Sequence, residues 1–551
     1  MTCGWSSRLV VGSLLSVQTL SVSRGMVLAD ESYPVPPRTP GAAVVAIDDD
    51  SDVDVELDAS EVSEAAEGVA PAPSSEAQKP APRPAAPPKK KTPPQFPGPK
   101  VLPPTGPFKP LFFDNDPRFP NPADCPDDWC ADGSGAAFEL GDVDFLLSSG
   151  GELRHRWMSQ DNRLQPGGPG KTDYQLWRWR HYLDLKAGDR VRLYVEGIDA
   201  SSFGEDLPEQ PIDVNRWDLL NAFIDVKVFD TGTGTQTLRY GRQELLFGRQ
   251  RLVSPLDWAN TRRNFSGFRY LVREPDWKLD VFAVNPVNSA TGYRSVTEFD
   301  NRFDRPNRDV WFSGAYWSYT AIENTNIDLY WLWLDNSDPT PGRADGRRHT
   351  IGGRYSELAP QADGRVWDFD VEAAYQCGDD LGERVNAGFA TAILGHTWKK
   401  AHWSPRLSGL AYFGTGDVDR SDGQTNTFDV LFPLGHAYWA ISDNLSGQNL
   451  LDLAAQVDVR PTDKSALVAA WHHFQLASDD DVVYNVAGAP IGTPGNGTDV
   501  GNALDLYGYY AFNPCFDVQL GASWFWYGEF IDRTTPRGDA TQFYVQTSLR
   551  Y

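Results

Sequence analysis

The chain has 551 residues, a formal net charge of −25 and a mean hydropathy of −0.45. Its length exceeds that of one ordinary compact domain, and its acidic charge excludes nucleic-acid binding, which requires a basic surface. Beyond the N-terminus no segment holds the ~18 consecutive apolar residues that a membrane-spanning helix needs, which excludes a helical membrane protein but not a barrel of alternating strands. The 19 Trp, 21 Tyr and 28 Phe fit the aromatic girdles of such a barrel.

Residues 1–29 show the order of features that defines a secretory signal peptide. Arg8 precedes the apolar run 9–20, and residues 27–29 form a small-residue cleavage site. The apolar run is too short to span a bilayer. We therefore expect the chain to be exported; the alternative is an ordinary buried first helix.

Residues 30–110 have a composition that cannot build a packed core. Ten acidic residues and no basic ones lie between Ile47 and Glu67, and a Pro/Ala/Lys-rich tract follows. Proline disrupts helix and sheet interiors, and such tracts favour extended polyproline II. We predict a disordered periplasmic segment, either a passive linker or one that contacts peptidoglycan or another periplasmic partner.

Residues 111–136 form an acidic connector with two cysteines, Cys125 and Cys130. In an oxidising compartment these thiols can pair, and the sequence leaves open whether they do. The crowded aspartates do not follow the spacing of an EF-hand, and no second Cys/His pair lies nearby at zinc-ligand spacing. We expect neither a metal site nor a cofactor.

From residue 137 to residue 551, apolar and polar residues alternate in segments that turn residues separate. Over residues 367–372, for example, Trp, Phe and Val alternate with Asp, Asp and Glu. Alternation puts one face of a strand in an apolar medium and the other in a polar one. At about 23 residues per strand and turn, the region predicts an all-β fold: a transmembrane, antiparallel, up-and-down β-barrel of about 18 strands, a size that leaves an aqueous channel.

Three features favour a membrane barrel over a soluble sandwich, whose strands also alternate. The segments approach the ~9–11 residues that cross a bilayer. The last strand has five residues on one face and ends on an aromatic residue, which resembles the signal that barrel-assembly machinery reads: Phe543, Val545, Thr547, Leu549 and Tyr551. Aromatic residues also gather at segment ends, where a girdle would lie: Trp311, Tyr316, Trp317, Trp524, Trp526 and Tyr527.

The polar faces of the early segments are unusually basic. Guanidinium groups bind carboxylates in bidentate fashion, and interleaved carboxylates keep a polyanion from binding too tightly. These residues predict either an anion-preferring pore or a lattice of internal salt bridges that stiffens the wall. The candidate pore-lining residues are Arg154, Arg156, Arg178, Arg180, Lys186, Arg190, Arg192, Glu196, Arg239, Arg242, Arg249, Arg251, Arg263 and Arg269.

Several of these residues lie in blocks that resemble the alginate export porin family. The blocks are 174–199, Tyr240–Glu244, Gly248–Leu252, Asp257–Thr261 and Arg263–Arg269. The resemblance implies an eighteen-stranded outer-membrane barrel with an arginine-rich pore that passes an acidic polysaccharide. It further implies that the basic residues of these blocks line the pore.

The combined expectation is a porin of the bacterial outer membrane that passes an acidic polysaccharide or oligosaccharide, or another anionic solute, and is not an enzyme. Its expected partners are outer-membrane lipid, the transported anion and the barrel-assembly machinery, with no nucleic acid. The alternative is a secreted soluble β-protein that binds or processes carbohydrate.

Overall fold

A computed structural model of the chain describes residues 102, 108–115, 135–141, 143–165, 168–287, 303–337 and 345–551, all of which belong to one compact unit. The signal peptide predicted over 1–29, nearly all of the segment 30–110 and the pair Cys125 and Cys130 lie outside these residues. Cys515 forms a disulfide bond.

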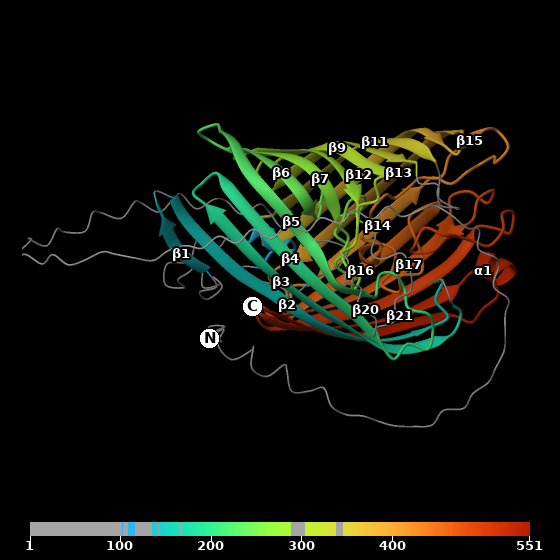
Figure 1. The fold of residues 1–551 in the computed structure, drawn as a ribbon. Coiled ribbons are helices and arrows are strands. Elements are labelled where there is room, and N and C mark those ends of the chain that lie inside the picture. The colour runs from blue at the N-terminus through green and yellow to red at the C-terminus, as the bar shows by residue number, and fades with distance from the viewer. Residues whose placement is uncertain are drawn as a thin grey trace, which may run out of the picture. The chain divides into compact units, whose positions relative to one another are not determined.

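The described chain forms a closed antiparallel barrel of eighteen strands, as predicted (Figure 1). Each strand pairs with the next in the ring, and β22 closes it by pairing with β2, from Glu152↔Arg550 to Asp161↔Thr541. The strands of the ring are β2 (Val143–Asp161), β3 (Lys171–Ala187), β4 (Val191–Phe203), β5 (Asn215–Asp230), β6 (Thr235–Gln243), β7 (Phe265–Arg273), β8 (Trp277–Pro286), β9 (Val310–Tyr319), β10 (Thr325–Asn336), β11 (Gly346–Pro360), β12 (Arg365–Asp380), β13 (Glu383–Trp398), β14 (Arg406–Gly414), β16 (Leu450–Thr462), β17 (Ser465–Leu476), β20 (Asp499–Asn513), β21 (Phe516–Tyr527) and β22 (Ala540–Arg550).

The remaining elements are short. β1 (Gly135–Leu140) pairs with the start of β2 alone among the described strands. The other elements are β15 (Gln424–Thr425), β18 (Val483–Tyr484), β19 (Pro490–Ile491), the helix α1 (Glu529–Thr534) and the 3-10 turns η1 (Phe112–Asp114) and η3 (Gly435–Ala437). No helix in the described part of the chain is both long enough and apolar enough to cross a membrane.

The outer face of the ring is apolar. In β12, Trp367 and Val371 are exposed, whereas Asp368, Asp370 and Glu372 are buried on the inner face. Exposed Leu, Val, Ile, Phe and Trp side chains occur on strands all around the ring. A soluble sandwich would cover such a surface, whereas a bilayer solvates it, and closure leaves no unpaired edge in the hydrocarbon.

The predicted aromatic girdle is correct only in part. Trp311 and Trp526 project outward, but Tyr316 and Tyr527 are buried on the lumen side. Neighbouring residues of a strand face opposite sides, so an aromatic cluster in sequence divides between lipid and lumen. Tyr551 is outside the ring, where its hydroxyl accepts a hydrogen bond from Trp179 Nε1 at 2.9 Å.

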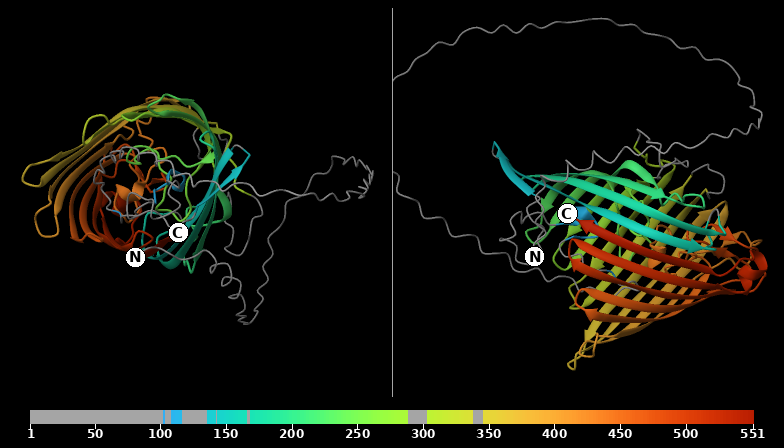
Figure 2. Two further views of the ribbon diagram at one scale, coloured as in Figure 1. Left: turned by 90° about the vertical axis from the view of Figure 1, so that its left-hand side faces the viewer. Right: turned by 90° about the horizontal axis from the view of Figure 1, so that it is seen from below.

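The two ends of the barrel differ in their connections (Figure 2). At the end where β22 finishes, here called the turn end, strands are joined by two to seven residues. At the opposite loop end, the connection 415–449 alone has 35 residues. Short turns at one end and long loops at the other are typical of outer-membrane barrels.

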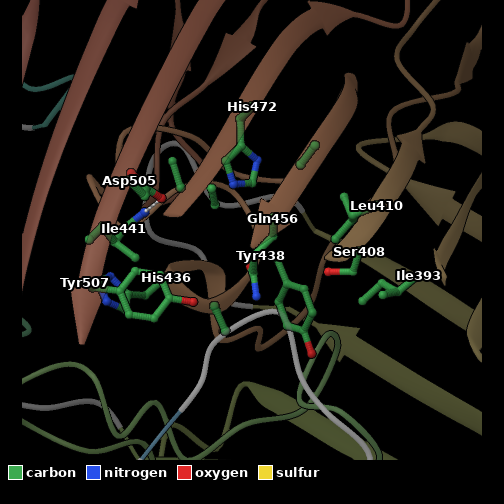
Figure 3. A pocket seen from close by; sticks show the side chains of 14 residues that line it. Ile393, Ser408, Leu410, His436, Tyr438, Ile441, Gln456, His472, Asp505 and Tyr507 are labelled. Carbon is green, nitrogen blue, oxygen red and sulfur yellow. Dashed lines mark hydrogen bonds between the residues drawn. The ribbon is translucent and has the colours of Figure 1, made fainter. Parts of the chain in front are cut away.

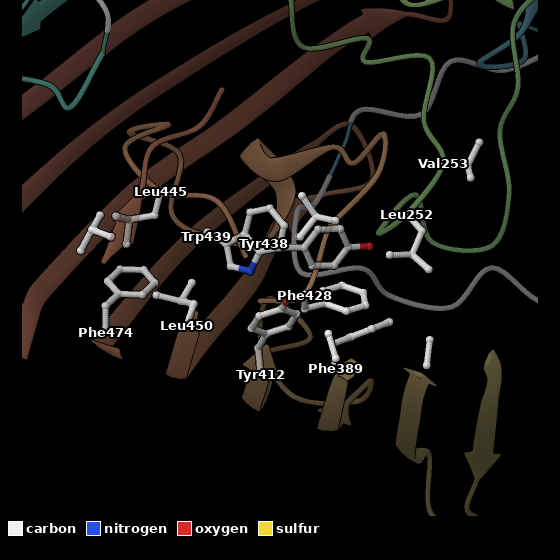
Figure 4. Close-up of a cluster of buried hydrophobic side chains, with 14 of the residues drawn as sticks. Leu252, Val253, Phe389, Tyr412, Phe428, Tyr438, Trp439, Leu445, Leu450 and Phe474 are labelled. Carbon is white, nitrogen blue, oxygen red and sulfur yellow. The ribbon is translucent and has the colours of Figure 1, made fainter. Parts of the chain in front are cut away.

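Two of the long connections, 244–264 and 415–449, fold into the barrel rather than away from it. They meet in an isolated parallel bridge between Val253 and Phe432, and Phe432 N donates to Leu252 O at 2.9 Å. With inward-facing side chains of the wall they form an apolar core, including Phe428 and Phe474 (Figure 4). The lumen therefore contains a packed core at this level, which strand alternation alone did not predict.

Candidate functional site in the barrel lumen

The structure brings most of the predicted pore-lining residues to the lumen. Arg249, Arg251 and Arg263 lie on the infolded connection 244–264 rather than on a strand. Arg190 lies elsewhere: it is exposed in the turn between β3 and β4. The others occupy inward positions of the wall: Arg154, Arg156, Arg178, Arg180, Lys186, Arg192, Glu196, Arg239, Arg242 and Arg269.

Strand alternation explains why these charged side chains point inward. Arg178 is 0% exposed, whereas its neighbour Trp177 on the outer face is 40% exposed. An arginine on the outer face would meet hydrocarbon without a partner, which costs about 2–4 kcal/mol at mid-depth. The same rule holds at β6 and β7, where Arg239 and Arg269 are buried beside exposed Tyr240 and Phe268.

One charge cluster joins β2 and β3 to the infolded connection 244–264. Arg178 Nη2 lies 2.6 Å from Glu152 Oε1 and 2.9 Å from Asp257 Oδ1. Arg550, from the last strand, approaches the other oxygen of Glu152 at 3.7 Å and pairs with Asp517 at 2.6 Å. This cluster connects the first and last strands of the ring.

A second cluster lies beside the first on β3 and β4. Arg180 Nη2 is 2.6 Å from Glu196 Oε1 and 4.0 Å from Glu244 Oε2. Arg262 pairs with Glu244 and with Asp257, so that it connects the two clusters. Each ion of this cluster is nearly or fully buried apart from Asp257, and such ions require partners because burial removes their hydration.

Across the lumen, the carboxylates of β12 pair with arginines in the same way. Arg251 Nη1 is 2.9 Å from Asp370 and 2.7 Å from Glu372, and Arg354 is 2.6 Å from Asp370. Burial alone would lower the pKa of Arg251, but Asp370 and Glu372 raise it above its usual value. Arg406 pairs through Nη1 with Asp458 of β16 and through Nη2 with Asp368 of β12. For these arginines, the contacts favour the interpretation as a lattice of salt bridges that stiffens the wall.

Arg154 and Arg156 differ from the arginines of these clusters. Arg154 donates to Asp257 O at 2.7 Å and to Ala259 O at 2.6 Å, and Arg156 donates to Gln546 Oε1 at 2.7 Å. Within the described chain, neither has a carboxylate within ion-pair distance. Among the residues that the structure describes, their positive charges therefore have no directly paired carboxylate.

A second feature of the lumen is a stack of side chains around Trp258, which we did not predict from the sequence. Arg156 Cζ lies 3.6 Å from the centroid of the Trp258 ring, and the ring centroids of His436 and Trp258 are 3.4 Å apart. His436 Nδ1 and Asp443 Oδ2 are 2.9 Å apart. The composition of residues 428–441 could have indicated that this connection is buried. These residues are almost uncharged, which is unusual for a hydrated surface loop.

A small cavity adjoins this stack (Figure 3). Tyr438 and Ile441 of the connection 415–449 line it, together with His472 and Asp505 of the wall. His472 Nδ1 is 3.0 Å from an oxygen of Asp452. The described residues contain no group of three or more His, Cys, Asp or Glu arranged to hold a metal ion.

Sequence comparison agrees with the barrel fold. The profile of the family described as Alginate export matches residues 145–545, from β2 to β22. The chain belongs to the alginate export family. The family and the closed barrel are those of outer-membrane channels. No curated protein sequence matches the chain.

Several solved structures are similar to this alginate export barrel. OccK5 (OpdH) of Pseudomonas aeruginosa has 11% identity and a TM-score of 0.48, covering 73% of this chain and 97% of that chain. OprD of the same organism has 12% identity and a TM-score of 0.47, covering 73% and 94%. OccAB1 of Acinetobacter baumannii has 12% identity and a TM-score of 0.49, covering 74% and 96%.

Proposed function

We propose that this alginate export chain is an anion-preferring outer-membrane channel for an acidic polysaccharide or oligosaccharide. The observation that carries the proposal is the pair Arg154 and Arg156, two inward guanidinium groups whose hydrogen bonds go to uncharged oxygens. A guanidinium group binds a sugar carboxylate in bidentate geometry, and Arg keeps its charge at all physiological pH values. These two residues would attract the anion.

The paired arginines have a different role in this proposal. Residues such as Arg178 and Arg180 already contact carboxylates at 2.6 Å. A polyanion that passes them meets both signs of charge, so that no site holds it tightly, as conduction requires. The ion pairs also keep the wall rigid around the path.

The differing ends give the proposed orientation. Short turns of outer-membrane barrels face the periplasm, so the turn end and the N-terminal segment would lie there. The exposed apolar ring would contact outer-membrane lipid, and the last strand, β22, with the Tyr551 that follows it would be read by the barrel-assembly machinery. The proline-rich segment would span the periplasm, where peptidoglycan is a candidate partner.

The test is the ion selectivity of the purified chain in planar bilayers under a KCl gradient. We expect a reversal potential that favours chloride, and we expect the double variant Arg154→Gln/Arg156→Gln to lose much of this preference. The matched control is Arg190→Gln, which removes a predicted but exposed turn arginine and should change nothing. An unchanged reversal potential in the double variant would assign the lumen arginines to the wall alone. Acidic oligosaccharides should block chloride current, and neutral ones of equal length should not.

A further inference from the structure

A short segment from the N-terminal part of the chain lies inside the ring (the blue segment in Figure 2). It comprises residues 108–115 and includes η1. Its apolar side chains are buried against aromatic side chains of β3, β4 and β5. The cluster consists of Leu111, Phe112, Phe113, Tyr182, Tyr194 and Phe223.

The two phenylalanines of this segment cover guanidinium groups of the lumen wall. Arg180 Cζ lies 4.2 Å from the ring centroid of Phe112. Arg239 Cζ contacts two rings, at 4.6 Å from the centroid of Phe113 and 3.6 Å from that of Phe223. A guanidinium group over an aromatic face is attracted by the ring quadrupole, more strongly where water is excluded. The segment therefore occupies faces of the arginines that a passing anion would meet.

The backbone of the segment is held from both sides. Arg192 Nη2 donates to Phe113 O at 2.7 Å, and Arg262 Nη2 donates to Pro110 O at 3.2 Å. Lys109 N donates to Asn115 Oδ1 at 2.8 Å, which closes the segment on itself. Arg192 is the second residue of β4, which begins at the turn end, so the segment lies toward that end of the lumen.

We propose that residues 108–115 are a displaceable plug, which blocks the turn end of the lumen and must leave before an acidic saccharide can pass. The proposal rests on the channel function proposed above. Residues 108–115 pair with no described strand, so that their departure breaks side-chain contacts and single hydrogen bonds but no part of the ring. The arginines that contact the plug also pair with carboxylates of the wall or of the connection 244–264, so that their charges stay balanced when the plug leaves.

Docking is tested first, without reference to transport. The photo-reactive analogue benzoylphenylalanine is placed at Phe113 in the full chain in outer-membrane vesicles, and crosslinked peptides are mapped by mass spectrometry. We expect crosslinks to peptides that contain Tyr194 or Phe223. The control position is Phe138 of β1, which is exposed and stacks on Phe145. The absence of crosslinks from position 113 to β4 or β5 would overturn the proposal.

Blocking is tested by single-channel recording. The variant Phe112→Ala/Phe113→Ala should have an open probability about tenfold higher than that of the wild type, which corresponds to about 1.4 kcal/mol of lost docking free energy. Phe138→Ala should match the wild type. A conducting chain whose plug variant opens no more often would overturn the blocking role even if the crosslink forms. If the crosslink forms but neither protein conducts, the channel function fails and the blocking role with it, whereas docking stands.

Discussion

Trp258 Nε1 donates a hydrogen bond to Asp443 Oδ2 over 2.6 Å, which joins the two infolded connections inside the barrel. The same ring is stacked between Arg156 of the wall and His436 of the second connection. Asp443 O in turn accepts from Arg163 Nη2 at 2.8 Å. A single tryptophan thus couples both connections to the wall, in the region where the proposed anion path passes.

The first prediction concerns this tryptophan. Trp258→Phe keeps an aromatic ring but removes the indole N–H. Because the buried carboxylate of Asp443 then lacks one hydrogen-bond donor, the free energy of unfolding should fall by about 1–3 kcal/mol. The measurement is urea unfolding in detergent micelles, followed by circular dichroism. Trp177→Phe on the outer face is the matched control and should unfold like the wild type. Equal stability of the two variants would show that the Trp258 hydrogen bond contributes nothing.

The second prediction concerns Arg406, which bridges two strands of the wall. Its Nη2 is 2.7 Å from Asp368 and its Nη1 is 2.8 Å from Asp458. Arg406→Gln leaves two buried carboxylates without their cation and should lower the free energy of unfolding by about 3–5 kcal/mol. Adding Asp368→Asn should recover part of this loss.

The control for Arg406 is an exposed ion pair. Arg365 and Asp363 lie 2.6 Å apart, with about half of each side chain exposed. Because solvent screens such a pair, Arg365→Gln should change stability by less than about 1 kcal/mol. If both arginine variants unfolded at the same urea concentration, the buried lattice would not stiffen the wall.

The third prediction is a pH dependence of the connection 204–214. Burial raises the pKa of Glu205 from 4.5 to about 8 and that of Asp213 from 3.8 to about 6. The folded connection therefore binds these protons more tightly than the unfolded one does, so the stabilisation is complete at low pH and is lost as pH rises from about 4 to about 8. Protease cleavage within 204–214 should become faster over this range.

Glu205→Gln isolates the upper part of that range. Glutamine keeps an acceptor for the Ser202 hydroxyl, which lies 2.7 Å from Glu205 Oε1, but it cannot ionise. The variant should show the change in cleavage rate only below about pH 6, where Asp213 still titrates. Glu323→Gln, in an exposed turn, should keep the wild-type profile. A Glu205→Gln profile identical to that of the wild type would remove Glu205 from the explanation.

The fourth prediction tests the outer face. Val371 lies midway along β12 and is 48% exposed. Val371→Arg should destabilise the inserted barrel by about 2–4 kcal/mol, because it puts a charge in hydrocarbon. Folding into liposomes, followed by the heat-dependent shift of the gel band, measures the effect. Val418→Arg, exposed on the connection 415–449, should insert normally. Normal insertion of the Val371 variant would show that this face does not meet lipid.

The amino-acid sequence determined the wall of this protein. A strict period of two assigned Arg178 and Arg180 to one face and Trp177 to the other, and the spacing of turns predicted about eighteen strands; both predictions are confirmed. Those properties are local, since each follows from neighbouring residues on one strand. The same local rule also predicted an anion path, but it could not say which arginines have no carboxylate within ion-pair distance among the described residues.

Only the tertiary structure decided how the lumen is filled. Arg156 meets Gln546, Arg154 meets residues 257–260, and Phe113 meets Phe223, although long stretches of sequence separate the members of each pair. Connections have no repeating pattern that reveals whether they fold inward, because that choice depends on complementary surfaces brought together by ring closure. The pairing of charges and the occupation of the lumen follow from that closure rather than from any local segment.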